Sequence, residues 1–201
     1  MVTMIRVGVE FFRALEAVDA RLAAEVGGAG CPRCGGRLHQ SNYWRKPRGG
    51  LVAPALCPSL RLSFCCGREG CRRRATPPSV RFLGRRVYWG AVVIVASVVS
   101  RVTKGAPFAP AAAEPETGVP RRTRRRWVGW WRGTFPSSAV FVAVSGRLVP
   151  AVARDQLPGS LLERMEGEGL APLGFLLRWL TPLTTRARPD AARGSRETRA
   201  M

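Results

Sequence analysis

The chain has 201 residues, 46% of them apolar, which is enough for one ordinary domain or two small ones. Its formal net charge is +20, so we expect a polyanionic partner, with nucleic acid ahead of an anionic membrane. The apolar, uncharged run at residues 87–100 is too short for a membrane span of about 20 residues. No secretory signal is recognisable at the N-terminus, so we expect a cytoplasmic protein without a membrane partner.

The positive charge is concentrated in two segments. Residues 31–86 carry thirteen basic side chains and one acidic side chain, Glu69. Residues 101–132 carry eight basic and two acidic side chains. A generally basic composition would not gather charge in this way, so these two segments are the predicted footprint of the partner.

The first predicted element is an amphipathic helix over residues 4–26. Phe11, Leu15, Val18 and Leu22 recur at helical spacing, and the sequence GGAG follows the helix. The chain then enters the segment that contains all six cysteines.

The first cysteine pair, in CPRCGG, has the form of a zinc knuckle. Cys31 and Cys34 are spaced so that two thiolates on a tight turn reach one metal ion, and the glycines after them allow the backbone to turn. In a cytoplasmic protein, paired cysteines bind metal more often than they form disulfides.

The second pair comes from the stretch FCCGREGC. It matches the Phe-x-Cys-x4-Cys hairpin of two-Cys, two-His zinc fingers, with Phe64 packed behind the site and Cys66 and Cys71 as ligands. Cys65 lies on the opposite face of a strand from Cys66 and points away, and Cys57 is left over.

The predicted metal centre therefore consists of Cys31, Cys34, Cys66 and Cys71 and holds one structural Zn²⁺ per chain, because four thiolates leave no coordination position for water. Two alternatives stay open: that the single histidine, His39, replaces Cys66, and that the cysteines are free thiols. We expect strands near 38–43 and 61–65 with an extended loop between them.

Helices dominate the remaining chain. A buried helix is predicted at 85–102, and a basic helix at 119–131 begins with Pro120 at its first position. Ser160 and Glu163 have the spacing of a capping box, and a further apolar helix covers 172–180. The polar, arginine-rich residues from 185 on are predicted to be disordered.

The basic helix combines an aromatic stripe with arginines. Its apolar side is formed by Val119, Thr123, Trp127, Trp130 and Trp131, and arginines occupy the other faces. Many helix-turn-helix recognition helices begin with such a pattern, in which the first turn contacts bases and nearby arginines hold phosphates. The alternative is a solvated basic helix that the tryptophans anchor.

The order of these motifs resembles bacterial proteins that combine a zinc ribbon with a helix-turn-helix and that are related to the N-terminal, DNA-binding part of insertion-sequence transposases. The resemblance covers about residues 10–183 and is strongest at 31–90. It implies that the four cysteines carry the metal and that the helix with Arg121 to Arg126 faces DNA.

The predicted fold is α+β and mainly α, with a small zinc ribbon of short antiparallel strands after an N-terminal helix and a helix-turn-helix-like region after the ribbon. The predicted parts are an N-terminal helix (1–29), the zinc ribbon (30–84), the basic helical region (85–133), an apolar helical region (134–184) and a disordered tail (185–201).

The sequence favours a DNA-binding protein without a catalytic domain of its own. The chain has three Asp and ten Glu, one His and no glycine-rich phosphate loop, so we do not expect an enzyme. Double-stranded DNA is the expected partner, and a homo-oligomer is compatible with the sequence.

The alternatives are an RNA-binding ribbon protein, in which Tyr43 and Trp44 stack on bases, and a protein-interaction module. The predicted nucleic-acid contacts are Arg45, Lys46, Arg48, Arg72, Arg73, Arg74, Arg121, Arg122, Arg124, Arg125 and Arg126.

Overall fold

A computed structural model of the chain describes residues 7–47, 59–83, 88–99 and 118–185. The fold is α+β and mainly helical, with short antiparallel strands after an N-terminal helix, which confirms the predicted fold class. The helices are α1 (Val9–Ala29), α2 (Gly90–Val99), α3 (Arg121–Gly133), α4 (Ala139–Ser145), α5 (Gly159–Leu162) and α6 (Ala171–Trp179). The strands are β1 (Leu38–Gln40), β2 (Tyr43–Trp44), β3 (Leu60–Arg61), β4 (Phe64–Cys66) and β5 (Arg74–Ala75), and the 3-10 turns are η2 (Phe135–Ser137), η3 (Arg154–Gln156) and η4 (Thr181–Thr184).

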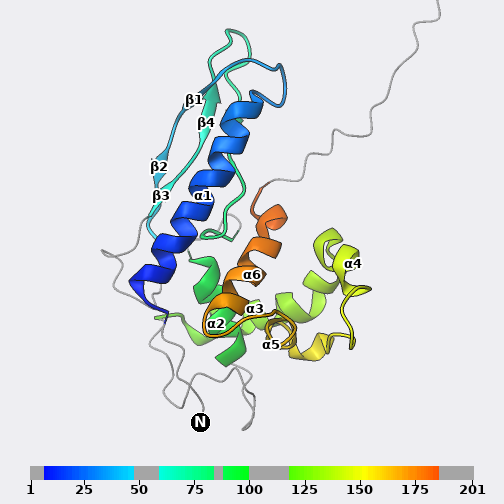
Figure 1. Ribbon diagram of the computed structural model, residues 1–201. Coiled ribbons are helices and arrows are strands. Elements are labelled where there is room, and N and C mark those ends of the chain that lie inside the picture. The colour runs from blue at the N-terminus through cyan, green and yellow to red at the C-terminus, as the bar shows by residue number, and fades with distance from the viewer. Residues whose placement is uncertain (1–6, 48–58, 84–87, 100–117, 186–201) are drawn as a thin grey trace, which may run out of the picture.

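Helix α1 is the longest element, and it runs along both parts of the molecule (Figure 1). It ends three residues later than predicted because Gly27, expected to break the helix, packs against the ring of Phe64. A Cβ atom at Gly27 would lie 3.2 Å from Phe64 Cζ. The helix ends at Gly30, whose φ of 76° lies in the region that favours glycine.

The strands form two small antiparallel sheets, in the orders β1-β4-β5 and β2-β3. Each of the two predicted strands is interrupted near its middle. At the interruption the side chain of Asn42 accepts a hydrogen bond from the Ser63 amide at 3.0 Å, while the Ser41 amide donates to the Ser63 carbonyl at 2.8 Å. The prediction missed β5, which pairs with β4 directly after the last cysteine.

The apolar side chains gather in two clusters that share α1. The smaller cluster lies in the ribbon and consists of Ala23, Cys31, Leu38, Phe64, Cys66 and Ala75. The larger cluster includes Phe12 and Leu15 from the first half of α1 together with side chains of α2, α3, α5 and α6. The C-terminal half of α1 therefore belongs to the ribbon, and its N-terminal half belongs to the helical part.

Helix α2 lies at the centre of the helical part, and nine of its ten residues are buried. It begins at Gly90 and ends at Val99; positions 85–87 and 100–102 of the predicted helix lie outside the described residues. None of the helices within the described residues is both long and apolar enough to cross a membrane.

Helix α3 packs on α2 through its tryptophans, as the aromatic stripe predicted. Trp127 and Trp131 are buried, and the Trp127 ring meets Tyr88 edge to face, with centroids 4.9 Å apart. The helix begins at Arg121, so Pro120 is its N-cap rather than its first helical residue. It ends at Gly133, two residues later than expected, because the apolar contacts continue into Phe135.

The predicted capping box at Ser160 and Glu163 is wrong. Helix α5 has Pro158 at its N-cap, and Ser160 lies inside the helix, where it is buried and donates to the Ala153 carbonyl at 2.8 Å. A buried hydroxyl needs a partner, and this longer-range bond replaces the local cap. Helix α6 lies one residue earlier than predicted, and positions 186–201 of the predicted disordered tail lie outside the described residues.

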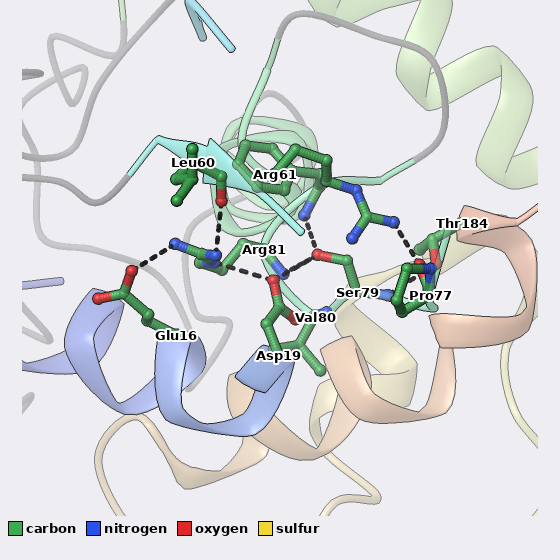
Figure 2. A network of polar contacts seen from close by, with 10 residues as sticks. Glu16, Asp19, Leu60, Arg61, Pro77, Ser79, Val80, Arg81 and Thr184 are labelled. Carbon is green, nitrogen blue, oxygen red and sulfur yellow. Dashed lines mark hydrogen bonds and ion pairs between the residues drawn. The ribbon is translucent and has the colours of Figure 1, made fainter. Parts of the chain in front are cut away.

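A buried polar network joins the ribbon to the helical part (Figure 2). Asp19 of α1 accepts hydrogen bonds from the Val80 amide at 2.7 Å, the Ser79 hydroxyl at 2.7 Å and Arg81 Nε at 2.9 Å. The Arg81 guanidinium also donates to the Leu60 carbonyl at 2.9 Å. A buried charge is tolerated only when it is paired and hydrogen-bonded, and this network meets both requirements.

The network extends to the C-terminal end of the described chain. The amide of Ser79 donates to the Thr184 hydroxyl at 3.0 Å, and Arg61 donates to the carbonyl of Pro77. One short segment, 77–82, thus touches α1, β3 and η4 at the same time (Figure 2).

Replacing Asp19 with Ala removes the buried carboxylate that pairs with Arg81 Nε and leaves the part-exposed Glu16 beside the buried guanidinium. Removing one member of a buried ion pair costs about 3–5 kcal/mol, so we expect the Asp19→Ala variant to lose that much unfolding free energy in urea. Glu16→Ala is the control, because Glu16 contacts the same guanidinium at 3.3 Å but is 43% exposed. Its expected loss is below about 1 kcal/mol. Equal losses in the two variants would contradict the assigned role of Asp19.

Candidate metal centre

Cys31, Cys34, Cys66 and Cys71 come together where α1 ends and where the chain turns from β4 to β5. Their sulfur atoms all lie within 4.8 Å of one another. The Sγ atoms of Cys31 and Cys71 are 3.7 Å apart, and those of Cys34 and Cys66 are 3.5 Å apart. A tetrahedral site with metal–sulfur bonds of about 2.3 Å has sulfur–sulfur edges of about 3.8 Å. The four thiols therefore form a cluster that can hold a metal ion.

The first knuckle is built by glycines and backbone hydrogen bonds. The Cys31 amide donates to the Gly36 carbonyl and the Gly35 amide to the Cys31 carbonyl, both at 2.8 Å. Gly35 has a φ of 69°. A Cβ atom on Gly36 would lie 3.2 Å from the sulfur of Cys66 and 3.3 Å from that of Cys34. Gly36 thus lets the two knuckles approach each other.

The second knuckle closes with a tight turn between Cys66 and Cys71. The amide of Cys71 donates to the Arg68 carbonyl at 3.1 Å, and Gly70 has a φ of 77°. The amide of Arg68 donates a hydrogen bond to the Cys66 sulfur at 3.4 Å. Such a donor stabilises a thiolate. The Arg68 guanidinium also donates to the Cys34 carbonyl at 3.3 Å, which links the two knuckles.

Strand alternation separates Cys65 from the cluster, as predicted. In the β1–β4 pairing Cys66 lies opposite Leu38 and Cys65 lies opposite His39. The Cys65 sulfur contacts the Arg72 carbonyl at 3.4 Å instead of another thiol. Cys57 lies outside the described residues.

His39 does not take the place of Cys66 in the cluster. Its imidazole lies against Gly67, where an added Cβ would be 2.4 Å from Nε2. Gly67 follows Cys66 directly, and its amide donates to the Arg37 carbonyl at 2.9 Å. The sequence assigned the glycines after Cys34 a role in turning the backbone but did not predict the contact of Gly36 with the second knuckle or the roles of Gly67 and Arg68.

The surroundings of the cluster shift the pKa values of two of its thiols in opposite directions. The backbone N–H of Arg33 favours the thiolate of Cys31 and, with smaller help from Cys34 and Cys71, lowers the pKa of Cys31 to about 6. For Cys66 the backbone N–H of Arg68 also favours the thiolate, but burial and the three neighbouring thiols outweigh it and raise the pKa to about 12. A metal ion must therefore displace a proton from Cys66.

The predicted nucleic-acid residues fall into two separate groups. Arg72, Arg73 and Arg74 are exposed beside the metal centre, and Arg74 already donates to Ser41 and Ser63. Lys46 is exposed, Arg45 is half-buried over the Phe82 ring at 5.5 Å, and Arg48 lies outside the described residues.

The second group lies on α3 in the helical part of the molecule (Figure 1). Arg121, Arg122, Arg125 and Arg126 are exposed, and Arg124 is half-buried. Arg72, Arg73 and Arg74 lie at the start of β5 and just before it in the ribbon, whereas the second group lies on α3. The predicted contacts therefore lie on two different parts of the fold, the ribbon and α3.

Comparisons with protein-family models, curated proteins and solved structures gave no match to this chain.

The two adjacent cysteines offer a sharp test of the ligand set. We expect Cys66→Ser to lose the bound metal and to unfold the ribbon, because a serine hydroxyl is a poor replacement for one of four thiolates. Cys65→Ser is the matched control and should keep full metal content, since its sulfur faces away from the cluster. Elemental analysis of the purified variants measures the metal. Equal metal loss in both variants would show that the assigned register is wrong.

The pKa values predict how metal affinity depends on pH. Cys66, with a pKa near 12, holds its proton across the neutral range, so binding at neutral pH releases at least that proton. The apparent affinity should rise at least tenfold per pH unit and should fall more steeply below about pH 6, where Cys31 is also protonated. Competition with a chelator of known affinity at several pH values measures the slope. An affinity that does not change with pH would contradict this assignment.

Proposed function

We propose that this chain is a DNA-binding protein in which the four-cysteine cluster holds one structural zinc ion. We further propose that it has no catalytic domain of its own and is related to the DNA-binding parts of transposases. The observation that carries the proposal is the exposed arginine surface of α3, which two buried tryptophans anchor to the helical core.

Zinc is the metal that best suits the cluster. Four thiolates at tetrahedral spacing bind Zn²⁺ or iron, and Zn²⁺ is the usual ion of closed structural sites. In such a site all four ligand positions belong to cysteines, so the metal ties Cys31 and Cys34 to Cys66 and Cys71 and takes no part in a reaction. The ribbon core has few apolar side chains, and metal binding would supply much of its folding free energy.

The geometry of α3 suits a phosphate backbone and a groove. Four exposed arginines occupy its first two turns, and the positive end of the helix dipole lies at the same end. Trp127 and Trp131 bury the opposite face in the larger hydrophobic cluster, so the arginine face keeps one orientation. A helix that enters the major groove uses its N-terminal turns for contact, and the order of motifs in the chain supports the same assignment.

The proposal is tested by duplex DNA binding as a function of salt. Log K should fall linearly with log salt, by about 0.9 for each phosphate contacted. Changing Arg121, Arg122, Arg125 and Arg126 together to Gln should reduce the slope by up to about 4 and weaken binding at least about 100-fold near 50 mM salt. Fluorescence anisotropy of a labelled duplex gives both quantities.

A charge-matched variant controls for the loss of net charge. Arg21, Arg147, Arg164 and Arg178 are also exposed and lie outside α3, and changing all four to Gln removes the same charge. This control should lose much less affinity than the α3 variant. Equal losses would show that α3 is not the interface, and absence of binding at low micromolar protein would favour a protein-interaction role.

A further inference from the structure

Trp44 is the most exposed aromatic side chain that the structure describes. It is 72% exposed, whereas Trp89, Trp127 and Trp131 are buried. Its backbone is nevertheless fixed, because Trp44 pairs with Leu60 across β2–β3 and the next amide, that of Arg45, donates to the Ser59 carbonyl at 3.0 Å. Core packing therefore does not account for this indole, which a fixed strand presents to solvent.

The surroundings of Trp44 are basic. Lys46, two residues further along the chain, is exposed. On the opposite face of the strand from Trp44, the Arg74 guanidinium lies 5.5 Å from the ring centroid of Tyr43. The whole segment 31–86 contains one acidic residue, Glu69, so an anionic ligand is favoured here.

An exposed indole beside positive charge fits one chemistry especially well. A nucleobase offers a flat face for the indole, and the phosphates next to it carry the complementary charge. Bases inside a duplex are already stacked on one another, so an indole on a surface strand can stack only on an unpaired base. An uncharged apolar partner would gain nothing from the basic side chains.

We propose that Trp44 is a stacking site for an unpaired nucleobase of a single-stranded nucleic acid, with Lys46 on an adjacent phosphate. This inference rests on the proposed nucleic-acid function and adds to it a single-strand site in the ribbon, separate from the duplex surface of α3. Single-stranded DNA and RNA share the chemistry that the site recognises.

The separation of the two sites makes them independently testable. Trp44 lies in the ribbon sheet β2–β3, whereas the arginines of α3 belong to the helical part. A variant at Trp44 should change single-strand binding and leave duplex binding unchanged. The four-arginine variant of α3 should do the reverse.

The experiment uses the full chain and oligonucleotides of about twelve nucleotides, oligo-dT and oligo-rU. Removing one stacked base contact corresponds to about a tenfold loss, so Trp44→Ala should bind the preferred oligonucleotide about tenfold more weakly. Trp44→Phe keeps an aromatic face and should lose about threefold or less. Phe175→Ala is the matched control, because Phe175 is 47% exposed on α6, and it should bind as the unmodified protein does.

Two further measurements keep the test decisive if Trp44→Ala unfolds the ribbon, which its metal content would reveal. Lys46→Gln should lower the salt slope for the single strand by about 0.7. Oligonucleotide binding should also quench a fluorescence component that is present in the unmodified protein and missing from Trp44→Phe.

Each outcome bears on one site. Tighter binding of oligo-dT shows that the preferred strand is DNA, and tighter binding of oligo-rU shows that it is RNA; either result supports the stacking site. Equal affinity of folded Trp44→Ala and the unmodified protein for both oligonucleotides, or an unquenched Trp44, would overturn it. Failure of the α3 variant to reduce duplex binding would instead overturn the proposed duplex surface and leave the Trp44 site standing.

Discussion

The rest of the structure depends on the buried carboxylate of Asp19. It lies near the middle of α1 and accepts hydrogen bonds from three successive residues, Ser79, Val80 and Arg81. The segment that leaves the ribbon is thereby fixed to the helix that precedes the ribbon. The following residues then lead into α2, and the bridge between Phe82 and Trp89 fixes the start of that buried helix. Without this contact the ribbon would be attached to the helical part mainly by apolar packing along α1.

The thiol cluster plays a corresponding role at the other end of α1. Cys31 follows the helix almost directly, and its partners Cys66 and Cys71 come from β4 and from the turn between β4 and β5. The ribbon thus has the buried Asp19 network at one end and a thiol cluster that can hold a metal ion at the other, with a small apolar cluster beside it. Small folds of this kind depend on such cross-links because their cores bury too little apolar surface.

Sequence patterns predicted the features that depend on local spacing. The interval between Cys31 and Cys34, the strand alternation that separates Cys65 from Cys66, and the aromatic stripe of α3 are all properties of a few neighbouring residues. The pairing of Asp19 with Arg81 could not be predicted in this way, because it joins residues 62 positions apart. The capping box at Ser160 failed for a related reason, since a distant carbonyl offered the buried hydroxyl a better partner. The extension of α1 through Gly27 likewise depends on the ring of Phe64, which sequence alone does not place.

One continuous helix shared by two cores has a consequence for cooperativity. Phe12 and Leu15 of α1 pack in the helical core and Ala23 packs in the ribbon, so each half of the helix is stabilised by a different set of neighbours. Loss of a metal ion bound by the four thiols would withdraw support from the C-terminal half alone. We expect α1 to fray from that end as far as the Asp19 contacts and to stay helical before them. The chain would then populate a partly folded state, and a single unfolding free energy would not describe it.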